Sequence, residues 1–262
     1  MTLFDTASYT KNPTRRFTFM SAPMDALTMQ ETLAIMEHAM QTRIRLQHVV
    51  VNVAKLVNMQ HDAVLRQDVS SSDLINIDGM GVVWGARLCG HTVPERVSGV
   101  DIMENLLSLC AAKGYRPYFF GAKQEVLELA IANIKTQYPT ISIVGYRNGY
   151  FTPAEEEGII RDIAASNADC LFIAISSPTK ERLLSQYKDI INVPFLMGVG
   201  GSIDIKVGIT KRAPLWMQNS GLEWFYRFLQ EPRRMFKRYL VTNGRFLVLV
   251  WREKFCYYRS SQ

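Results

Sequence analysis

Short apolar runs alternate with longer amphipathic segments between residues 17 and 199 of the chain. Six of these runs are predicted to be buried strands, at residues 48–53, 74–77, 117–120, 141–145, 170–175 and 193–199. The segments around them have helical periodicity, at residues 28–42, 54–66, 80–89, 100–113, 124–137 and 153–166. Continuous apolar strands separated by helices are typical of a mostly parallel sheet that is covered on both faces. The pattern therefore predicts an α/β fold, preceded by a small hairpin at residues 17–27.

The pattern changes after Asp204, where no further strand is predicted. Residues 221–230, 232–241 and 245–257 are expected to form three short helices rich in arginine and aromatic residues. We therefore divide the chain into an α/β domain at residues 1–210 and a helical C-terminal appendage at residues 211–262.

The stretch from residue 73 to residue 101 is the strongest candidate for a site. The apolar run at 74–77 ends at Asp78 and Gly79, and a predicted helix follows. Open α/β sheets bind their ligands at the carboxyl ends of such strands. Arg96 and Asp101 follow around a second glycine, Gly99. The same residues also fit a tight Asp-Gly turn beside a solvated arginine, and spacing alone does not decide between these interpretations.

Composition places the chain among ordinary cytosolic proteins. Hydrophobic residues make up 48% of the 262 residues and charged residues 21%. The four cysteines show no paired spacing, which favours reduced thiols. The N-terminal residues lack the apolar core of a signal peptide, and the longest apolar run, at residues 246–251, is too short to span a bilayer.

Positive charge is concentrated in the appendage. Residues 211–262 contain eleven Lys and Arg against three Glu, a net charge of +8, so the preceding residues carry −2 of the total of +6. This asymmetry favours an anionic partner: nucleic acid, a membrane surface or a phosphorylated substrate. An ordinary packed helix with solvated basic residues is the simpler interpretation. Recurring aromatic and arginine residues favour an interfacial membrane helix instead, and the α/β body offers no aromatic–basic platform for RNA.

Several familiar chemistries are poorly supported. The glycines at positions 198, 200 and 201 do not form a dinucleotide fingerprint, and neither a Walker motif nor a nucleophile elbow occurs. Histidines and cysteines lack zinc spacing, and no Asp-x-Asp pair is present to hold a metal on a nucleotide diphosphate. We therefore expect no metal and no cofactor. A bound diphosphate would be held by arginine, lysine, backbone N–H groups and helix N-termini.

Motifs spread from about residue 20 to residue 240 resemble, in the same order, those of the WecG/TagA/CpsF glycosyltransferases (glycosyltransferase family 26). The matching stretches are residues 49–52 (VVVN), 78–84 (DGMGVVW), 95–101 (ERVSGVD), 119–121 (FFG), 138–139 (YP), 149–151 (GYF), 177–181 (SPTKE), 198–204 (GVGGSID), 211–216 (KRAPLW), 221–227 (GLEWFYR) and 231–234 (EPRR). The resemblance implies a Rossmann-like, GT-E-like body with a membrane-contacting C-terminal appendage. It also implies inverting, metal-independent transfer from a UDP-sugar to a polyprenyl-diphosphate-linked saccharide, in bacterial surface-polysaccharide or wall-polymer synthesis.

The resemblance also implies roles for individual residues. Asp78 matches the family's proposed base, and Arg96 would stabilise the departing diphosphate. The substrate-binding positions that it implies are Asn52, Gly79, Gly149, Tyr150, Lys180, Glu181, Gly200 and Asp204. The basic residues expected at the acceptor diphosphate and the membrane are Arg233, Arg234, Lys237 and Arg238. For Trp216, Glu223 and Trp224 we expect structural roles.

Two departures from the family pattern leave the donor sugar open. The family often has threonine where this chain has Val50, and Pro-x-Gln-Glu where this chain has Lys180 before Glu181. A lysine in place of the amide would suit an acidic sugar or an additional phosphate contact.

Two functions of different classes remain. The first is a glycosyltransferase on the inner face of the cell membrane, whose turnover depends on Asp78. The second is a non-catalytic module that binds a nucleotide-sugar and recruits an assembly complex to the membrane, in which Asp78→Asn would be silent. The sequence leaves open whether the chain is a monomer or a homo-oligomer, and which polymer is made.

Overall fold

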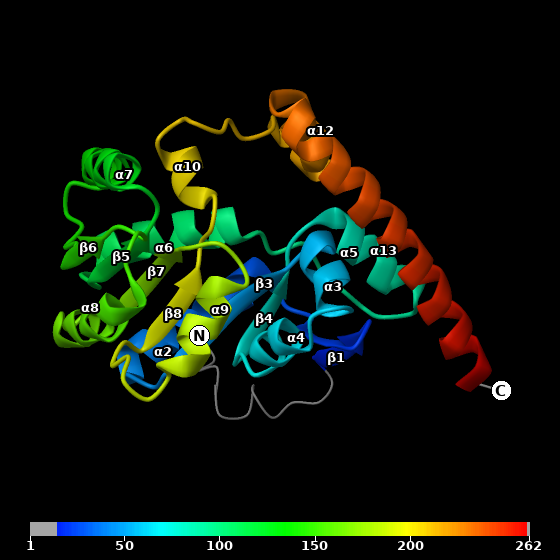
Figure 1. Ribbon diagram of the computed structural model, residues 1–262, viewed down its shortest axis with the longest axis horizontal. Helices are drawn as coiled ribbons and strands as arrows, with labels where there is room; N and C mark the ends of the chain where they lie inside the picture. The colour runs from blue at the N-terminus through cyan, green and yellow to red at the C-terminus, as the bar shows by residue number, and fades with distance from the viewer. Residues whose placement is uncertain (1–14, 261–262) are drawn as a thin grey trace.

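The protein is built around a six-stranded parallel sheet (Figure 1). The computed structural model describes residues 15–260, apart from the side chains of residues 219, 234, 235, 237, 238 and 256–260. The sheet has the strand order β4-β3-β8-β7-β5-β6. Its strands are β3 (Leu46–Val51), β4 (Leu74–Ile77), β5 (Pro117–Gly121), β6 (Gly145–Arg147), β7 (Cys170–Ala174) and β8 (Phe195–Gly198). The predicted α/β fold with a parallel sheet is confirmed.

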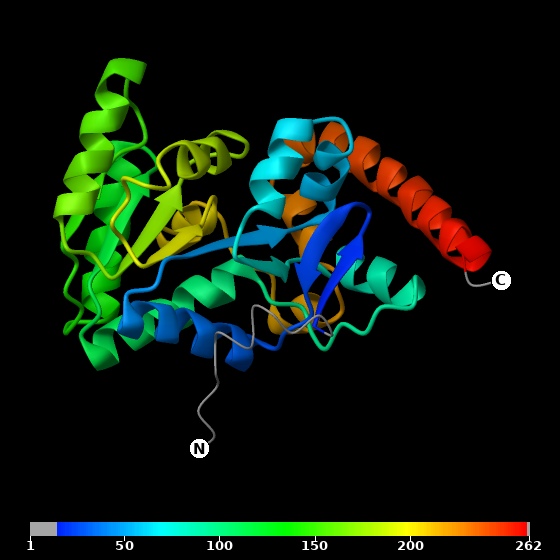
Figure 2. The same cartoon turned by 90° about the horizontal axis from the view of Figure 1, so that it is seen from below.

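Helices cover both faces of the sheet (Figure 2). Side chains that alternate along each strand divide the core into a layer on each face. On one face, Leu74 and Phe172 pack in a cluster with α2 (Met29–Thr42), α6 (Gly99–Lys113), α7 (Gln124–Gln137) and α10 (Ser202–Lys206). On the other face, Leu171 and Ile173 pack against α8 (Pro153–Ala165) and α9 (Thr179–Gln186). Ile75 and Ile77 pack on that face against α3 (Val53–Met59), α4 (Ala63–Ser70) and α5 (Met80–Leu88).

A two-stranded hairpin lies beside strand β4. Its strands, β1 (Arg16–Phe19) and β2 (Ala22–Asp25), are antiparallel, as the sequence predicts. Asp25 accepts a hydrogen bond from the backbone N–H of Ile75 (2.7 Å) and pairs with Arg16 (2.7 Å). The hairpin therefore covers an edge that would otherwise expose unpaired backbone groups.

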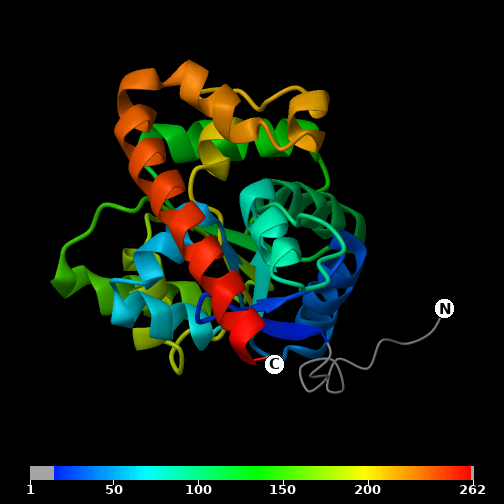
Figure 3. The ribbon, with the colours of Figure 1, turned by 90° about the vertical axis from the view of Figure 1, so that its right-hand side faces the viewer.

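The appendage consists of α11 (Leu215–Asn219), α12 (Glu223–Gln230) and α13 (Pro232–Ser260), shown in orange and red in Figure 3. The prediction of separate helices at residues 232–241 and 245–257 is wrong, because α13 runs through both. Phe246 and Val250 are buried on the body and pack against Gly85. A Cβ atom at position 85 would lie only 3.0 Å from Phe246 and 3.1 Å from Val250. This packing anchors the part of the helix that follows Gly244 and offsets the destabilisation that a glycine causes. None of the helices in the described part of the chain has the length and apolar content that crossing a bilayer requires.

Two further boundaries differ from the sequence prediction. The helix predicted at residues 54–66 is divided into α3 and α4, because Asp62 accepts a hydrogen bond from the N–H of Leu65 (2.9 Å) and starts a new helix. The strand predicted at residues 141–145 begins only at Gly145. Ile141 lies in the core before the strand, and the residues that pair with β5 are the more polar Gly-Tyr-Arg sequence at the sheet edge. The apolar pattern therefore identifies Ile141 as a core residue and does not identify the strand that follows it.

Candidate active site

Asp78 lies at the carboxyl end of β4, where the sequence places the site. Its backbone N–H donates to the carbonyl of Val51 (2.9 Å), which extends the β3–β4 pairing by one residue. Gly79 then adopts a φ of +103°, a conformation open to glycine, and α5 begins at the next residue. The chain thus turns sharply away and leaves the Asp78 carboxyl half-buried at the edge of the sheet.

Burial raises the pKa of Asp78 above its ordinary value of 3.8. The nearby positive charge of Arg96 lowers this pKa, and the negative charge of Glu223 raises it again. The net effect is an increase, so the carboxylate has a higher proton affinity than an exposed aspartate. A carboxylate with a raised pKa is suited to accept a proton from a substrate hydroxyl.

Arg96 connects the body of the protein with the appendage. Its Nη1 donates to Glu223 Oε2 over 2.8 Å, and its Nη2 lies 3.7 Å from Asp101 Oδ2. The neighbouring Val97 N–H donates to the carbonyl of Ile77 (3.0 Å), which fixes this loop beside Asp78. Only 14% of the Arg96 side chain is exposed. The charge of Arg96 acts on Asp78, and the assignment of both residues to one catalytic site stays a prediction.

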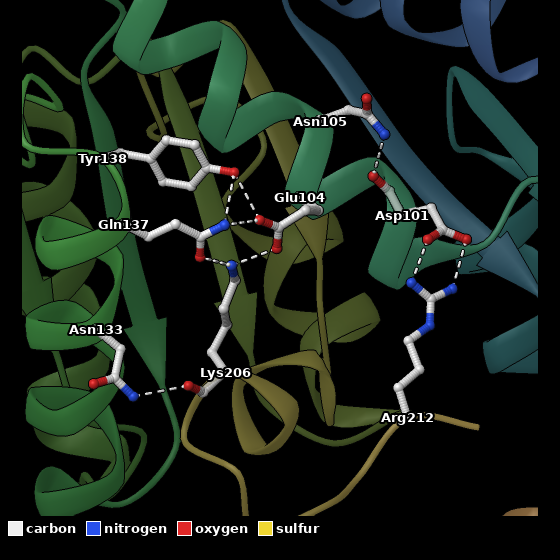
Figure 4. A network of polar contacts seen from close by, with 8 residues as sticks. All are labelled: Asp101, Glu104, Asn105, Asn133, Gln137, Tyr138, Lys206 and Arg212. Atoms are coloured by element: carbon white, nitrogen blue, oxygen red, sulfur yellow. Dashed lines mark hydrogen bonds and ion pairs between the residues drawn. The ribbon is translucent and has the colours of Figure 1, made fainter. Parts of the chain in front are cut away.

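Arg212, in the segment that leads to the appendage, binds Asp101 at the first turn of α6 (Figure 4). Both terminal nitrogens of the guanidinium donate to the two carboxylate oxygens, and Nη2–Oδ2 is 2.7 Å. This fork-to-fork arrangement fixes orientation as well as charge. The Nε of Arg212 is buried and has no hydrogen-bond partner among the described atoms.

Together these residues form what we call the arginine–carboxylate cluster: Asp78, Arg96, Asp101, Arg212, Glu223 and Arg227. Arg227, on α12, belongs to it because its charge lowers the pKa of Asp78. Three carboxylates are balanced by three guanidinium groups when Asp78 is ionised. Three members, Arg212, Glu223 and Arg227, come from beyond residue 210. For Glu223 a structural role was expected, and the structure shows it paired with Arg96 in this cluster.

A second charged group, the lysine triad, consists of Lys55, Lys180 and Glu181. Glu181 Oε1 accepts hydrogen bonds from Lys55 Nζ (2.8 Å) and lies 3.1 Å from Lys180 Nζ. The three residues are 9%, 9% and 2% exposed. Burial tends to raise the pKa of Glu181, but the two ammonium groups outweigh it and lower this pKa to about 2.

The predicted substrate-binding residue Glu181 is therefore bound to Lys180, its predicted neighbour, and to Lys55, which was not predicted. Burial lowers the pKa of Lys55, and the charges of Glu181 and Asp78 oppose this change. The Lys180 side chain runs over Gly198 at the end of β8, where a Cβ atom would lie 2.5 Å from its Cε. Lys55 lies in the first turn of a helix that follows a buried strand, and this position could have identified it as a candidate site residue.

Asn52 has a local structural contact in addition to its predicted role in the substrate pocket. It is the N-cap of α3, and its Oδ1 accepts a hydrogen bond from the backbone N–H of Lys55 (3.0 Å). This bond satisfies one of the free N–H groups at the start of the helix. Asn52 thereby fixes the helix turn that carries Lys55 into the triad.

The remaining predicted positions lie farther along the same edge of the sheet. Gly149 and Tyr150 follow β6, five strand positions from β4, a separation of roughly 24 Å at the usual spacing of strands. The N–H of Gly149 donates to the carbonyl of Ala122 (2.9 Å), and Gly149 packs so closely on Gly121 that an added Cβ would lie 3.0 Å from its Cα. The Tyr150 side chain is 66% exposed.

Gly200 and Asp204 lie between these two ends of the edge, in the turn after β8 and in α10. Gly200 has a positive φ of +49°. The following Lys206 is bound to Glu104 of α6 and donates to Gln137 of α7 (2.9 Å), so α10 is held against both helices (Figure 4). The structure therefore distributes the predicted site residues along one edge of the sheet rather than in one contact cluster.

Of the basic residues predicted at the start of α13, Arg233 is exposed. The side chains of Arg234, Lys237 and Arg238 lie outside the described part of the structure. Among the described residues, no group of three His, Cys, Asp or Glu side chains is arranged to hold a metal ion.

Comparison with known proteins gives this geometry a context. The chain is 36% identical over 186 residues to the N-acetylglucosaminyldiphosphoundecaprenol N-acetyl-beta-D-mannosaminyltransferase of Bacillus subtilis (strain 168). The aligned residues cover 71% of this chain and 72% of the relative. Residues 17–260 match the family described as "Glycosyl transferase WecG/TagA/CpsF family". This match includes the body, the Asp78 turn and the appendage. The chain belongs to the WecG/TagA/CpsF family of glycosyltransferases.

Proposed function

We propose that the protein transfers a sugar from a UDP-sugar to a polyprenyl-diphosphate-linked saccharide, with inversion and without a metal ion. The observation that carries this proposal is the half-buried Asp78 carboxyl, whose pKa burial raises, beside the guanidinium of Arg96. The lipid-linked acceptor is supported by the name of the B. subtilis relative, which acts on an N-acetylglucosaminyl-diphosphoundecaprenol. Such a reaction serves the synthesis of bacterial surface polysaccharide or wall polymer.

In this proposal the donor lies along the carboxyl edge of the sheet. Its uridine lies beside Gly149 and Tyr150, where Gly149 packs closely on Gly121 and Tyr150 is exposed. Its diphosphate and sugar extend past Gly200 and Asp204 toward β3 and β4. A nucleotide-sugar is elongated and can contact the ends of several neighbouring strands at once.

Asp78 acts as the general base. A hydroxyl of the acceptor attacks the anomeric carbon as the bond from that carbon to the phosphate oxygen breaks, and the bonding electrons leave with UDP. The hydroxyl proton passes to the Asp78 carboxylate. Arg96 stabilises the negative charge that develops on the departing diphosphate, because a fixed guanidinium in a partly buried site is more effective than solvent.

Residues 211–262 serve in this proposal as a membrane-associating appendage on the catalytic domain formed by residues 1–210. Five apolar side chains of α13 share one face, at intervals of four or seven residues, and each is between 55% and 68% exposed: Phe236, Leu240, Leu247, Trp251 and Phe255. Phe246 and Val250, on the adjoining side of the helix, anchor it on the body. Arg245 and Arg252, seven residues apart, are exposed beside the apolar face. This arrangement suits a helix lying in the anionic inner surface of the cell membrane.

The test is release of UDP from a panel of UDP-sugars, with EDTA present and a polyprenyl-diphosphate-linked saccharide supplied in anionic vesicles. We expect release that requires the acceptor, that survives EDTA and that identifies the donor. Asp78→Asn should bind UDP but release it from the UDP-sugar about 10³-fold more slowly. Turnover that is equal in wild type and Asp78→Asn would refute the role of the base. Binding of UDP-sugars without turnover by either protein would support the alternative, a non-catalytic recruitment module.

A further inference from the structure

Glu223 is the main counter-ion of Arg96. The ion pair has a length of 2.8 Å, and its two side chains are only 14% and 18% exposed. Asp101, the other acid beside Arg96, lies at 3.7 Å and already accepts both terminal nitrogens of Arg212. The guanidinium that the proposed function assigns to a substrate diphosphate is therefore occupied by a carboxylate of the same chain.

The charge balance of the cluster bears on whether a diphosphate can bind while Glu223 is paired with Arg96. With Asp78 ionised, its three carboxylates and three guanidinium groups sum to zero, so the cluster offers no surplus positive charge to a diphosphate. Placing a dianion among these groups without removing a carboxylate would bury unbalanced negative charge, which is costly. One carboxylate must move away from Arg96 for the diphosphate to bind there.

Glu223 is the carboxylate whose element is most readily displaced. Asp78 follows directly on a strand of the central sheet, and Asp101 lies on α6, which is packed in the core. Glu223 lies in the first turn of α12, a helix of eight residues none of which is fully buried. Small elements with few buried side chains move at a lower cost in free energy than core elements.

We propose, on the basis of the proposed function, that Glu223 and the diphosphate of the donor are alternative partners of Arg96. Carboxylate and phosphate oxygens both accept the planar guanidinium fork, so one can replace the other without a change in the orientation of Arg96. Glu223 is thus a positioning residue. It keeps Arg96 directed toward the site in the absence of substrate and is displaced, with α12, when the diphosphate arrives.

The test is the affinity of the full-length protein for UDP, measured by isothermal titration calorimetry at fixed low ionic strength. Glu223→Gln should bind UDP about fivefold more tightly than wild type, because the amide is a weaker competitor for the guanidinium than the carboxylate. Uridine, which lacks phosphates, should show no such change. Glu157→Gln is the matched control, since it removes the same charge from an exposed pair on α8.

Glu223→Asp provides a second, more conservative variant. Its carboxylate is one methylene shorter and is withdrawn from Arg96, so UDP should bind with an affinity between those of wild type and Glu223→Gln. Affinity for UDP that is unchanged or weaker in the folded Glu223 variants would overturn the exchange and assign Glu223 a purely supporting role. An equal gain for uridine would overturn it as well.

These outcomes are separable from failure of the proposed function. Acceptor-dependent turnover by wild type, combined with no gain in affinity for Glu223→Gln, would refute the exchange alone. Tighter binding of UDP by Glu223→Gln without turnover by any protein would support the exchange and refute the transferase. Absence of UDP binding by every protein would refute both.

Discussion

Two charged clusters lie at the same edge of the sheet, and they are built in opposite ways. The lysine triad belongs entirely to the body, and its three residues are 2–9% exposed. The arginine–carboxylate cluster joins the body to the appendage, and its Arg96–Glu223 pair retains partial exposure. A pair buried within one packed unit cannot lose a partner without leaving a charge in the interior. A half-buried pair between two elements can exchange its partner for a ligand.

The difference assigns different tasks to the two clusters. The triad ties α3, which follows β3, to α9, which follows β7, and its Lys180 crosses Gly198 at the end of β8 between them. It therefore fixes the strand ends along which the donor is proposed to lie. The arginine–carboxylate cluster supplies the groups that would contact substrate. Breaking the triad should change stability first, and breaking the other cluster should change binding and turnover first.

The largest effect is expected from Asp78→Asn. Removing the general base should lower kcat by about 10³-fold, within the usual range for a positioned proton acceptor. The same change should raise the thermal midpoint by a few degrees at neutral pH, because ionised Asp78 is less favourable in the folded than in the unfolded chain. That gain should be absent below pH 3.8, where the carboxyl is protonated in both states, and should grow as the pH rises above it.

Asp68→Asn is the matched control for this variant. Burial also raises the pKa of Asp68, which lies on α4, and its Oδ2 is buried without a hydrogen-bond partner among the described atoms. Its replacement should raise the thermal midpoint in the same direction and leave kcat unchanged. A large loss of kcat in Asp68→Asn would mean that such variants act through the fold, and the assignment of Asp78 as base would lose its support.

Lys55→Met should break the triad and test its structural task. Glu181 would remain buried with Lys180 as its single positive neighbour, at a cost of about 3 kcal/mol in the free energy of unfolding. Urea denaturation at pH 7 measures this loss. Lys113→Met, which removes the exposed partner of Glu37, should leave the urea midpoint unchanged. A triad that can be broken with no loss of stability would remove the contrast between the two clusters.

The pH dependence of stability gives a second measurement on the same triad. The pKa of Glu181 is lowered to about 2 from an ordinary value of 4.5. The stabilisation that accompanies this shift is complete above pH 4.5 and is lost as the pH falls toward 2. In Lys55→Met the pKa of Glu181 should rise, because one of the two positive charges that lower it is gone. The loss of stability on acidification should then begin at a higher pH.

Local patterns were sufficient to predict the position of Asp78 at the end of a buried strand. The strand at residues 74–77 and the Asp78-Gly79 turn are adjacent in the chain, and the rule that ligands bind at strand ends then locates Asp78. Glu223 lies 127 residues from Arg96, and no periodicity or motif encodes which charges meet across that distance. Lys55 was missed for a related reason, since its partner Glu181 is 126 residues away.

The same distinction applies to the fold. Helices with a regular apolar periodicity of their own were predicted well, as for α7 at residues 124–137. The continuity of α13 was not predicted. It depends on the packing of Phe246 and Val250 against Gly85, about 160 residues earlier in the chain. Family resemblance supplied the proposed roles of the candidate site residues, and the contacts within the candidate site came from the structure alone.

The smallest expected effect is a difference between the pH profiles of kcat/KM, which reports the free enzyme, and kcat, which reports the substrate complex. In the free enzyme Glu223 raises the pKa of Asp78, so Glu223→Gln should move the acid limb of the kcat/KM profile to lower pH. Once the donor diphosphate has replaced Glu223 at Arg96, that carboxylate no longer acts on Asp78. The acid limb of kcat, which reports the complex, should therefore move less than that of kcat/KM. Equal shifts of both limbs would mean that Glu223 stays beside Arg96 during turnover, whereas Glu157→Gln should move neither.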